Sequence, residues 1–517
     1  MAGPFSDLWR LYRVARTLGR HDALIPREYL DGAPFSLHLV RFFFGSWRKQ
    51  EGGAGERLRQ ALQSLGPAHI KLGQVLATRP DIVGEDIASA LEGLQDRLPP
   101  FATLEARAAV AASLGKPVEE LFARFGEPVA AASIAQVHDA ETADQPPRRV
   151  AVKVLRPNIE SEFARDLSAL ALAARLAEKL FAEARRLRVE ALIDTLAQST
   201  AIELDLRMEA AAASELAERT GPDFRVPQVD WSRTAARVLT TEWIDGIPVR
   251  DVEALRAAGH DPKEMALTLM RAFLTQALRE GFFHADLHPG NLFVDGEGRL
   301  VAVDFGIMGR LDDSMRRFMA ETLAGFLARD YVRVAEAHYE AGFVPRRHPV
   351  ETFAQALRAI GEPIFGRSAR EVSMARLLQQ LFATTRRFDM QAQPQLLLLQ
   401  KTMVVVEGVS RSLDPDFDIW EAARPVVERW MIERLGPEAR LREAAEGVGA
   451  LGRVAQNLPL LLKNAETISA MLADGGLKLH PDSARAIAEA QRPRPLHLVL
   501  WLAAGAAGLA AALWWMI

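Results

Sequence analysis

The stretch HADLHPGNLF, residues 284–293, constrains this chain most, because it places an acid and an amide in one short loop. Asp286 and Asn291 lie five positions apart, and VDFG follows with a second acid, Asp304. Two short apolar runs, LFVD and LVAV, joined by GEG, predict a hairpin between the two acids. Such a hairpin would return both carboxylates to one place. Carboxylate and amide oxygens are ligands that Mg²⁺ prefers, so the pattern predicts a metal-binding loop.

Two further residues complete a set that suits phosphoryl transfer. That reaction needs a cation on the phosphates, an anion that holds the cation, and oxygen ligands for metal ions. Lys153 lies in the predicted strand RRVAVKVL, and Glu209 lies on a later helix. With Asp286, Asn291 and Asp304 they resemble the protein-kinase signature of strand lysine, helix glutamate, Asp-x₄-Asn loop and DFG. The set predicts ATP and Mg²⁺ as ligands.

Three features depart from an ordinary protein kinase. A segment without glycine stands where the Gly-rich loop belongs, and it consists of Ala130, Ala131, Ala132, Ser133, Ile134, Ala135, Gln136, Val137 and His138. Alanine disfavours positive φ and close backbone approach, so we expect the nucleotide to bind differently. KLGQ places Lys71 and Gln74 on one helix face. ELDLRME brings Glu203 and Asp205 close to Glu209 in the sequence. These are more carboxylates than are needed to pair with one lysine.

These departures carry a specific resemblance. KLGQ, AAASIAQVH, VAVKVLRP, ELD, HADLHPGN and VDFG, all between residues 60 and 310, closely resemble the motifs of the UbiB/ADCK atypical kinase family, and of its bacterial UbiB branch in particular. The resemblance implies that Lys153 contacts the ATP phosphates and pairs with Glu209. It implies that Asp286 stands where a kinase has its catalytic base. It also implies that Asn291 and Asp304 bind Mg²⁺.

The family resemblance gives the KLGQ helix a role as well. It implies that this helix lies across the site where a kinase admits its protein substrate, and that Lys71, Gln74 and Glu203 meet there, beside Asp205. A blocked site favours water over a protein hydroxyl as the phosphoryl acceptor. The implied function is an ATPase or kinase at the membrane that supports ubiquinone biosynthesis. Its partners would be isoprenoid quinone precursors and other enzymes of that pathway.

Two other functions stay open at this stage. The chain is compatible with a true kinase of a protein or a small molecule, and with a scaffold that binds ATP without turnover. The intact set Lys153, Asp286, Asn291 and Asp304 argues against the scaffold.

His284 and His288 lie four positions apart around Asp286 and could suggest a different metal site. Loop histidines more often orient the backbone or a catalytic aspartate. We therefore expect that positioning role for both.

Helical periodicity, breaks at Gly and Pro, and short β-branched runs predict an α+β protein with a small β-containing lobe and a mainly helical lobe. The family resemblance implies that these parts form a kinase-like two-lobe fold. The expected parts are a helical extension (1–125), an N-lobe (126–246), a helical C-lobe (247–440), a helical juxtamembrane segment (441–495) and a transmembrane helix (496–517). Strands are expected in PVAAASIAQVHDA, RRVAVKVL, RVPQVDW and ARVLTTEWI, and LLLLQKTMVVVEGV is expected to be a buried helix.

Composition excludes several other classes of site. At 517 residues, with 49% hydrophobic and 25% charged, the chain has the balance of an ordered globular protein. A formal net charge of −4 gives no global reason to expect nucleic-acid binding. The absence of cysteine excludes disulfides, a cysteine nucleophile and thiolate metal sites, and it fits a reducing compartment.

The C-terminal sequence predicts attachment to a membrane. Residues 498–517 carry no charge, and this length suffices to span a hydrocarbon core of about 30 Å. Arg492 and Arg494 precede the segment, so we expect the soluble part to be cytoplasmic. The resemblance to the bacterial UbiB branch implies that the membrane is the bacterial inner membrane. Ala504 and Gly508 form a small-xxx-small pair, which suits helix pairing in a homodimer. The family resemblance implies two spans, whereas this sequence predicts one.

The N-terminal sequence MAGPFSDLWRLYRVARTLGR mixes arginines with Leu8, Trp9 and Tyr12. A basic amphipathic helix that lies on anionic lipid head groups has this pattern. A helix packed on its own domain has it too, and the sequence leaves both possibilities open.

Overall fold

The computed structural model describes residues 4–24, 52–77, 83–94, 98–180, 182–365, 387–388, 390 and 394–435. Nearly all of them belong to one compact unit, Met1–Ile432. The predicted juxtamembrane segment 441–495 and transmembrane helix 496–517 lie outside these ranges. Every helix within them is too short or too polar to cross a membrane.

Helices dominate the described residues before Phe122. They are α1 (Pro4–Arg20), α3 (Ala54–Leu65), α4 (Pro67–Ala77), α6 (Glu85–Glu92), α7 (Thr103–Leu114) and α8 (Val118–Leu121). Around α4 the packing is tight, because a Cβ at Gly73 would lie 2.3 Å from Leu94 Cδ1 and 2.8 Å from Leu62 Cδ1. The glycine therefore lets the KLGQ helix approach its neighbours closely.

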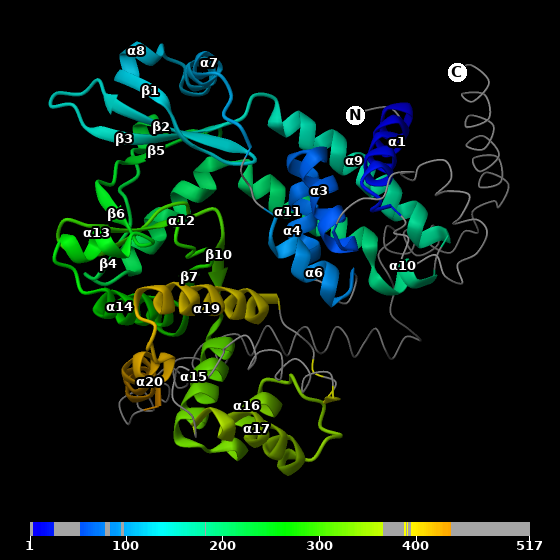
Figure 1. Ribbon diagram of the computed structural model, residues 1–517, viewed down its shortest axis with the longest axis vertical. Coiled ribbons are helices and arrows are strands. Elements are labelled where there is room, and N and C mark those ends of the chain that lie inside the picture. Colours follow the sequence, from blue (N-terminus) through cyan, green and yellow to red (C-terminus); the bar gives the residue numbers. More distant parts are fainter. Residues whose placement is uncertain are drawn as a thin grey trace, which may run out of the picture. The chain divides into compact units, whose positions relative to one another are not determined.

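The first sheet has the order β1-β2-β3-β5 and is antiparallel throughout. Its strands are β1 (Phe122–Ala131), β2 (Ala135–Thr142), β3 (Arg149–Leu155) and β5 (Val238–Glu242). In Figure 1 this sheet lies beside α7 and α8. The structure divides PVAAASIAQVHDA between two strands, contrary to the single run expected, because a turn intervenes. The Ala132 N–H closes that turn by donating to the Ala135 carbonyl at 2.8 Å.

Strand alternation decides which side chains of the first sheet face α7. Val150, Val152 and Val154 on β3 are buried in a cluster that includes Val110 of α7. Successive residues of a strand point to opposite faces, so Lys153 points away from that cluster. The alternating pattern RVAVKVL thus sets the direction of the lysine.

Four helices follow the first three strands. They are α9 (Ile159–Leu180), α10 (Ala182–Leu187), α11 (Val189–Glu203) and α12 (Leu206–Arg219). The expected strand RVPQVDW is wrong in extent, since β4 comprises only Phe224–Arg225. Pro227 has no N–H to offer a sheet, and beyond it only Val229 forms an isolated bridge, with Thr241.

A second sheet has the order β4-β9-β8-β6 and includes the predicted LFVD and LVAV hairpin. Its further strands are β6 (Gly246–Pro248), β8 (Leu292–Asp295) and β9 (Leu300–Ala302), and β7 (Phe282–His284) pairs separately with β10 (Met308–Arg310). The short helix η2 (Trp231–Arg233) precedes β5. Helices α13 (Val252–Ala257) and α14 (Pro262–Leu274) and the π-helix η3 (Thr275–Glu280) lead into β7.

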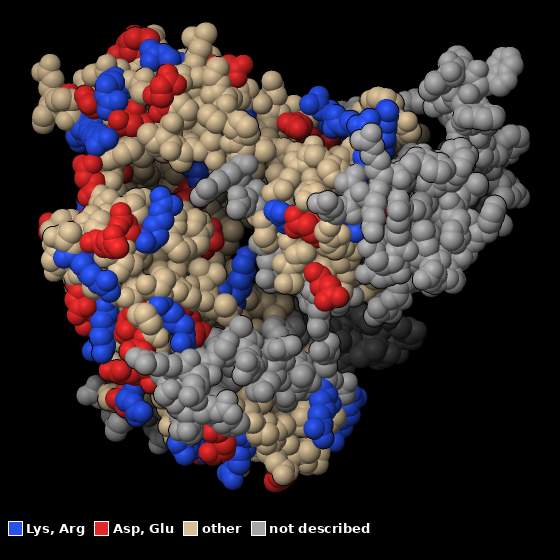
Figure 2. All heavy atoms as spheres, viewed as in Figure 1, with Lys and Arg blue, Asp and Glu red and all other residues tan. Residues whose placement is uncertain are grey.

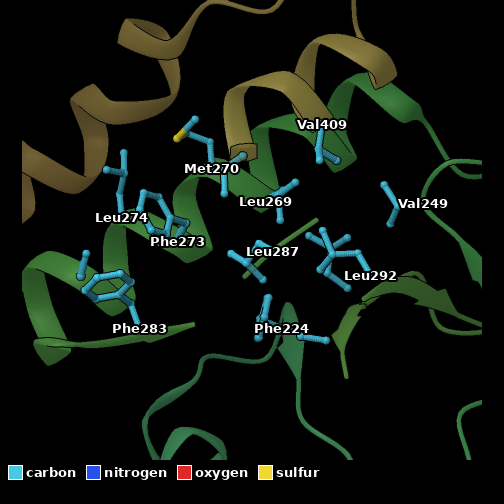
Figure 3. Packing of buried hydrophobic residues seen from close by; sticks show 14 of the residues in the cluster. Phe224, Val249, Leu269, Met270, Phe273, Leu274, Phe283, Leu287, Leu292 and Val409 are labelled. Atoms are coloured by element: carbon cyan, nitrogen blue, oxygen red, sulfur yellow. The ribbon is translucent and has the colours of Figure 1, made fainter. Parts of the chain in front are cut away.

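Among the described residues, the largest buried cluster joins this sheet to α14 and to two later helices, α19 (Pro394–Leu413) and α20 (Ile419–Leu435). Helix α15 (Asp313–Ala328) packs against it through Met315 and Met319. Helices α16 (Tyr331–Glu340) and α17 (Val350–Phe365) pack in a separate buried cluster. LLLLQKTMVVVEGV is a buried helix, as expected, because it forms α19 and its Val409 lies in the largest cluster. Figure 3 shows Leu287 and Leu292 packed with residues of α14 and α19. These leucines fix the HADLHPGN loop to the core at two points.

Candidate nucleotide and metal site

Lys153 is held between two carboxylates. Its Nζ donates to both carboxylate oxygens of Glu209, at 2.8 and 2.9 Å, and to Oδ1 of Asp304 at 3.0 Å. Glu209 is buried in the first turn of α12, whereas the Asp304 side chain is 48% exposed. Three residues far apart in the sequence therefore form one charged cluster.

The cluster shifts the acidity of its members. Burial would lower the pKa of Lys153, but the carboxylates of Asp304 and Glu209 outweigh it and raise that pKa. Burial raises the pKa of Glu209 to about 7. Burial also acts to raise the pKa of Asp304. The nearby Lys153 ammonium has the larger effect and holds the pKa of Asp304 well below its usual range. At neutral pH Lys153 and Asp304 are therefore an ionised pair.

The HADLHPGN loop places Asp286 and Asn291 together. The Asn291 amide donates to the Asp286 carbonyl at 3.2 Å and to the Asp286 carboxylate at 3.5 Å. Asn291 is buried, whereas Asp286 is 38% exposed. An exposed carboxylate beside an orientated amide can accept a proton or orient a small acceptor.

Both histidines of the loop bind backbone, as expected. The Asp286 N–H donates to His284 Nδ1 at 3.1 Å, and the Gly290 N–H donates to His288 Nδ1 at 3.0 Å. Burial lowers the pKa of His284 to about 4, so its ring is neutral at pH 7. No cluster of three or more metal-binding side chains of the His, Cys, Asp and Glu types occurs among the residues that the structure describes. His284 therefore orients the backbone at Asp286, and His288 orients the backbone at Gly290.

The backbone joins this loop to Asp304. The Val303 N–H donates to the Asn291 carbonyl at 2.9 Å, directly before Asp304. Asp304 has φ of +67°, in the left-handed region that a residue with a side chain seldom adopts. The Gly306 N–H approaches Asp304 Oδ1 at 3.4 Å. Such strain concentrates at functional sites, and here it directs the carboxylate towards Lys153.

The donor set at this place fits a hard divalent cation. Asn291 and Asp304 offer an amide and a carboxylate, the oxygen donors that Mg²⁺ accepts alongside phosphate oxygens and water. Asp304 is already ionised and partly exposed, so it needs no proton loss before it binds a cation. Asn291 and Asp304 would hold the ion.

The alanine-rich segment forms a turn that binds Arg156. The Arg156 side chain donates to the Ala132 carbonyl at 3.2 and 2.9 Å, and the Arg156 N–H donates to the Ile134 carbonyl at 2.8 Å. Among residues 130–138 none has positive φ. The turn therefore lacks the left-handed conformation that glycine supplies to a Gly-rich loop. A different mode of nucleotide binding stays a prediction.

Two side chains of the segment differ from the nucleotide-binding prediction. Gln136 and His138 pair across the sheet with Val154 and Val152, so they share the α7 face rather than that of Lys153. Gln136 exchanges hydrogen bonds with the backbone of Phe101 at 2.8 and 3.1 Å. The His138 ring lies 2.9 Å from the Gly126 carbonyl. Both side chains therefore bind backbone within this lobe. Strand alternation places them on the face opposite to Lys153. Of these residues Val137 pairs with Lys153 and shares its face.

The KLGQ helix makes one strong contact with the ELD segment. Lys71 Nζ lies 2.6 Å from Glu203 Oε2, and these side chains are 11% and 19% exposed. Asp205 instead caps α12, because its carboxylate accepts the Arg207 N–H at 3.1 Å. Gln74 is half-buried on the same helix as Lys71. The structure thus brings Lys71 to Glu203 and gives Asp205 a different task.

Sequence reasoning missed two residues that support the loop. Gln276, in the π-helix η3, accepts the His284 N–H at 3.2 Å. The Thr402 hydroxyl of α19 lies 3.1 Å from the Ala285 carbonyl and 2.9 Å from the Leu398 carbonyl, and its one proton is shared between these two acceptors. Both are fully buried and act on residues adjacent to Asp286. No local pattern marks either residue, although a π-helix is a known sign of a functional region.

Comparisons with known proteins agree with this geometry. The family described as ABC1 atypical kinase-like domain matches residues 93–338, and the UbiB helical domain matches residues 357–418. A "Probable protein kinase UbiB" of Marinobacter nauticus is 40% identical over 470 residues, which are 89% of this chain and 85% of the relative. The protein of that name from Pseudomonas aeruginosa is 44% identical over 461 residues, 86% of each chain.

A solved structure described as the complex of Rv3197 with erythromycin from Mycobacterium tuberculosis has a TM-score of 0.48 and 24% identity. The match covers 72% of this chain and 95% of the Rv3197 chain. The curated relatives match at much higher identity and over most of their own length. The motifs, the kinase-like fold and these relatives agree, and the chain belongs to the UbiB family of ABC1 atypical kinase-like proteins.

Proposed function

We propose that this chain is an ATP-dependent phosphoryl-transfer enzyme. One observation carries the proposal: the Lys153 ammonium lies between the carboxylates of Glu209 and Asp304, next to a loop that presents Asp286. Phosphoryl transfer depends mainly on positioning and charge neutralisation, and this cluster supplies both. A scaffold that only binds nucleotide would not need the exposed Asp286.

Each residue has a task in this proposal. Lys153 neutralises the ATP phosphates, and Glu209 keeps it in place. Asn291 and Asp304 hold Mg²⁺, which supplies positive charge to the phosphate oxygens when it is bound. Asp286 orients the acceptor and takes its proton. The backbone of the Ala132–Ala135 turn lies on the nucleotide, in place of a Gly-rich loop.

Water is the proposed acceptor. The Lys71–Glu203 ion pair fastens α4 to the end of α11, directly before the cap of α12. Ala68 of α4 packs in one buried cluster with Ala135 and Leu206. A helix held against the turn and α12 would obstruct a folded protein substrate but would admit water. The reaction is then hydrolysis of ATP.

The proposed setting is ubiquinone biosynthesis at the bacterial inner membrane. The UbiB relatives and the motifs support the pathway. The apolar segment 496–517 would attach the chain to the bilayer, where isoprenoid quinone precursors reside, and anionic head groups and other enzymes of the pathway would be its partners. ATP turnover would drive access to, or extraction of, these precursors.

The test follows the γ-phosphate of labelled ATP. The full chain is incubated with ATP and Mg²⁺, with and without anionic liposomes, beside Asp304→Asn. Free phosphate, protein-bound label and lipid-bound label are separated. We expect free phosphate that rises with liposomes and disappears in the variant.

Other outcomes assign the alternative functions. Label on another protein or on a small molecule, lost in Asp286→Asn, would make the chain a true kinase and remove the blocking role of α4. Stabilisation by nucleotide without Mg²⁺ dependence or turnover would make it a scaffold.

A further inference from the structure

Helix α1 is docked on α9 through one polar face. The buried Asp7 accepts a hydrogen bond from the Ser168 hydroxyl at 2.9 Å, and Arg10 forms an ion pair with the buried Asp166. A hydrogen bond and an ion pair to another helix, both made to buried carboxylates, fix the rotation of α1 about its axis. The docking therefore also determines which side chains of α1 are exposed to solvent on the opposite face.

That opposite face begins with a patch of large apolar side chains. Leu8, Trp9 and Tyr12 are 46%, 65% and 43% exposed, and the two aromatic rings stack with centroids 5.5 Å apart. Single exposed apolar residues are ordinary, but three that adjoin on one helix face form a patch. Trp and Tyr are the residues enriched at the membrane–water interface, because their rings are apolar and their polar groups tolerate water.

The rest of the exposed face is basic. Arg13, Arg16 and Arg20 are exposed, and the one acidic residue of α1, Asp7, is buried on the docked side. Figure 2 shows Lys and Arg atoms gathered at the position of α1, whereas both signs of charge mix over the first sheet. The exposed face of α1 thus combines an aromatic patch with positive charge and offers no acid.

We propose that this face of α1 lies on an anionic bilayer surface, with Leu8, Trp9 and Tyr12 at the head-group level and the arginines against lipid phosphates. Basic amphipathic helices with aromatic residues bind membranes in this manner. A second copy of the chain is a poorer occupant, because two such faces would oppose their arginines. The surface extends the membrane setting proposed above, but it does not depend on ATP turnover.

The absence of cysteine permits a direct test. The full chain carrying Leu8→Cys is labelled with an environment-sensitive fluorophore and reconstituted into phosphatidylglycerol vesicles. The fluorophore in Leu8→Cys should shift to shorter wavelength and be quenched by nitroxide-labelled lipids. Leu104→Cys on α7, whose native leucine is 78% exposed, is the matched control and should show neither change. No nucleotide is present, so failure of the ATP chemistry leaves the result unaffected.

Charge is tested in the same labelled chain. The shift should fall sharply in phosphatidylcholine vesicles, and Arg13→Gln with Arg16→Gln should reduce it in phosphatidylglycerol towards that lower value. Equal signals from Leu8→Cys and Leu104→Cys would overturn the proposal, as would a shift that ignores lipid charge and both arginines. A shift that appears in detergent alone and grows with protein concentration would also overturn it, in favour of a second copy.

Discussion

Lys71 Nζ lies 2.6 Å from Glu203 Oε2, and Glu203 lies two residues before Asp205, the cap of the helix that carries Glu209. Glu209 in turn holds Lys153 at 2.8 Å. The KLGQ helix and the charged cluster are therefore connected through a short, well-packed path. Changes in α4 should reach the site by this path, although the two motifs are distant in the sequence.

Lys71→Met should break the ion pair and leave Glu203 partly buried without its cation. Because both side chains retain some contact with water, we expect a loss of about 1–2 kcal/mol in unfolding free energy. If α4 excludes protein substrates, the ratio of protein-bound label to free phosphate should also rise. Lys71→Arg keeps the charge and is the control. A ratio that stays the same in Lys71→Met would contradict the blocking role.

Asp304→Asn should remove the Mg²⁺-dependent stabilisation by nucleotide. The variant retains the Lys153–Glu209 contact but loses one anionic oxygen of the metal site. Thermal denaturation with ATP, with and without Mg²⁺, measures the effect. Asp245→Asn, at a carboxylate that is 78% exposed, should behave as the wild type. A Mg²⁺-dependent shift that survives in Asp304→Asn would place the ion elsewhere.

Variants of His284 and His338 can separate an effect on the position of Asp286 from an effect on the stability of the folded chain. Burial lowers the pKa of each to about 4, so the folded state binds fewer protons than the unfolded state between about pH 4 and 6.5. Each histidine therefore favours folding above pH 6.5, and this contribution, about 3 kcal/mol at most, is lost as the pH falls through that range.

His284→Asn and His338→Asn should both flatten the loss of stability on acidification, measured by urea unfolding at several pH values. Only His284→Asn should lower ATP turnover at pH 7.5, because only His284 accepts the Asp286 N–H. Equal turnover losses in the two variants would indicate a general effect of instability.

Gly73→Ala should destabilise the chain. The added Cβ would lie 2.3 Å from Leu94 Cδ1, and overpacking of this kind costs about 1–3 kcal/mol. Gly408→Ala, in helix α19, meets nothing within 4 Å and should stabilise the chain by up to about 1 kcal/mol, because alanine favours helix. Denaturant unfolding of both variants gives the comparison. Stabilisation by Gly73→Ala as well would mean that packing around α4 is looser than described.

Thr402→Val should lower ATP turnover with little change in nucleotide affinity. The substitution keeps the shape of the side chain but removes the hydroxyl that donates to the Ala285 carbonyl, next to Asp286. The stability cost should be about 1 kcal/mol. Thr402→Ser retains the donor and should recover most of the turnover. If serine and valine act alike, the contact with the loop has no role in positioning Asp286.

Sequence reasoning predicted the local elements well where a short pattern decides the structure. The alternation in RVAVKVL determined β3 and the face of Lys153, and the GEG segment determined the β8–β9 hairpin. It failed where a partner far along the chain decides. The turn within PVAAASIAQVHDA binds Arg156, and β4 pairs with β9, so both elements have partners outside the segment that was predicted.

The sequence by itself determined the chemical set, because Lys153, Asp286, Asn291 and Asp304 are recognisable by residue type and order. Only the tertiary structure decided which partner each acidic side chain contacts. Glu203 and Asp205 look equivalent in the ELD motif, yet one binds Lys71 and the other caps α12. Gln136 and His138 look like part of the loop, yet they face α7. An ion pair or a strand face depends on neighbours that the local sequence does not contain, and these exist only once the chain has folded.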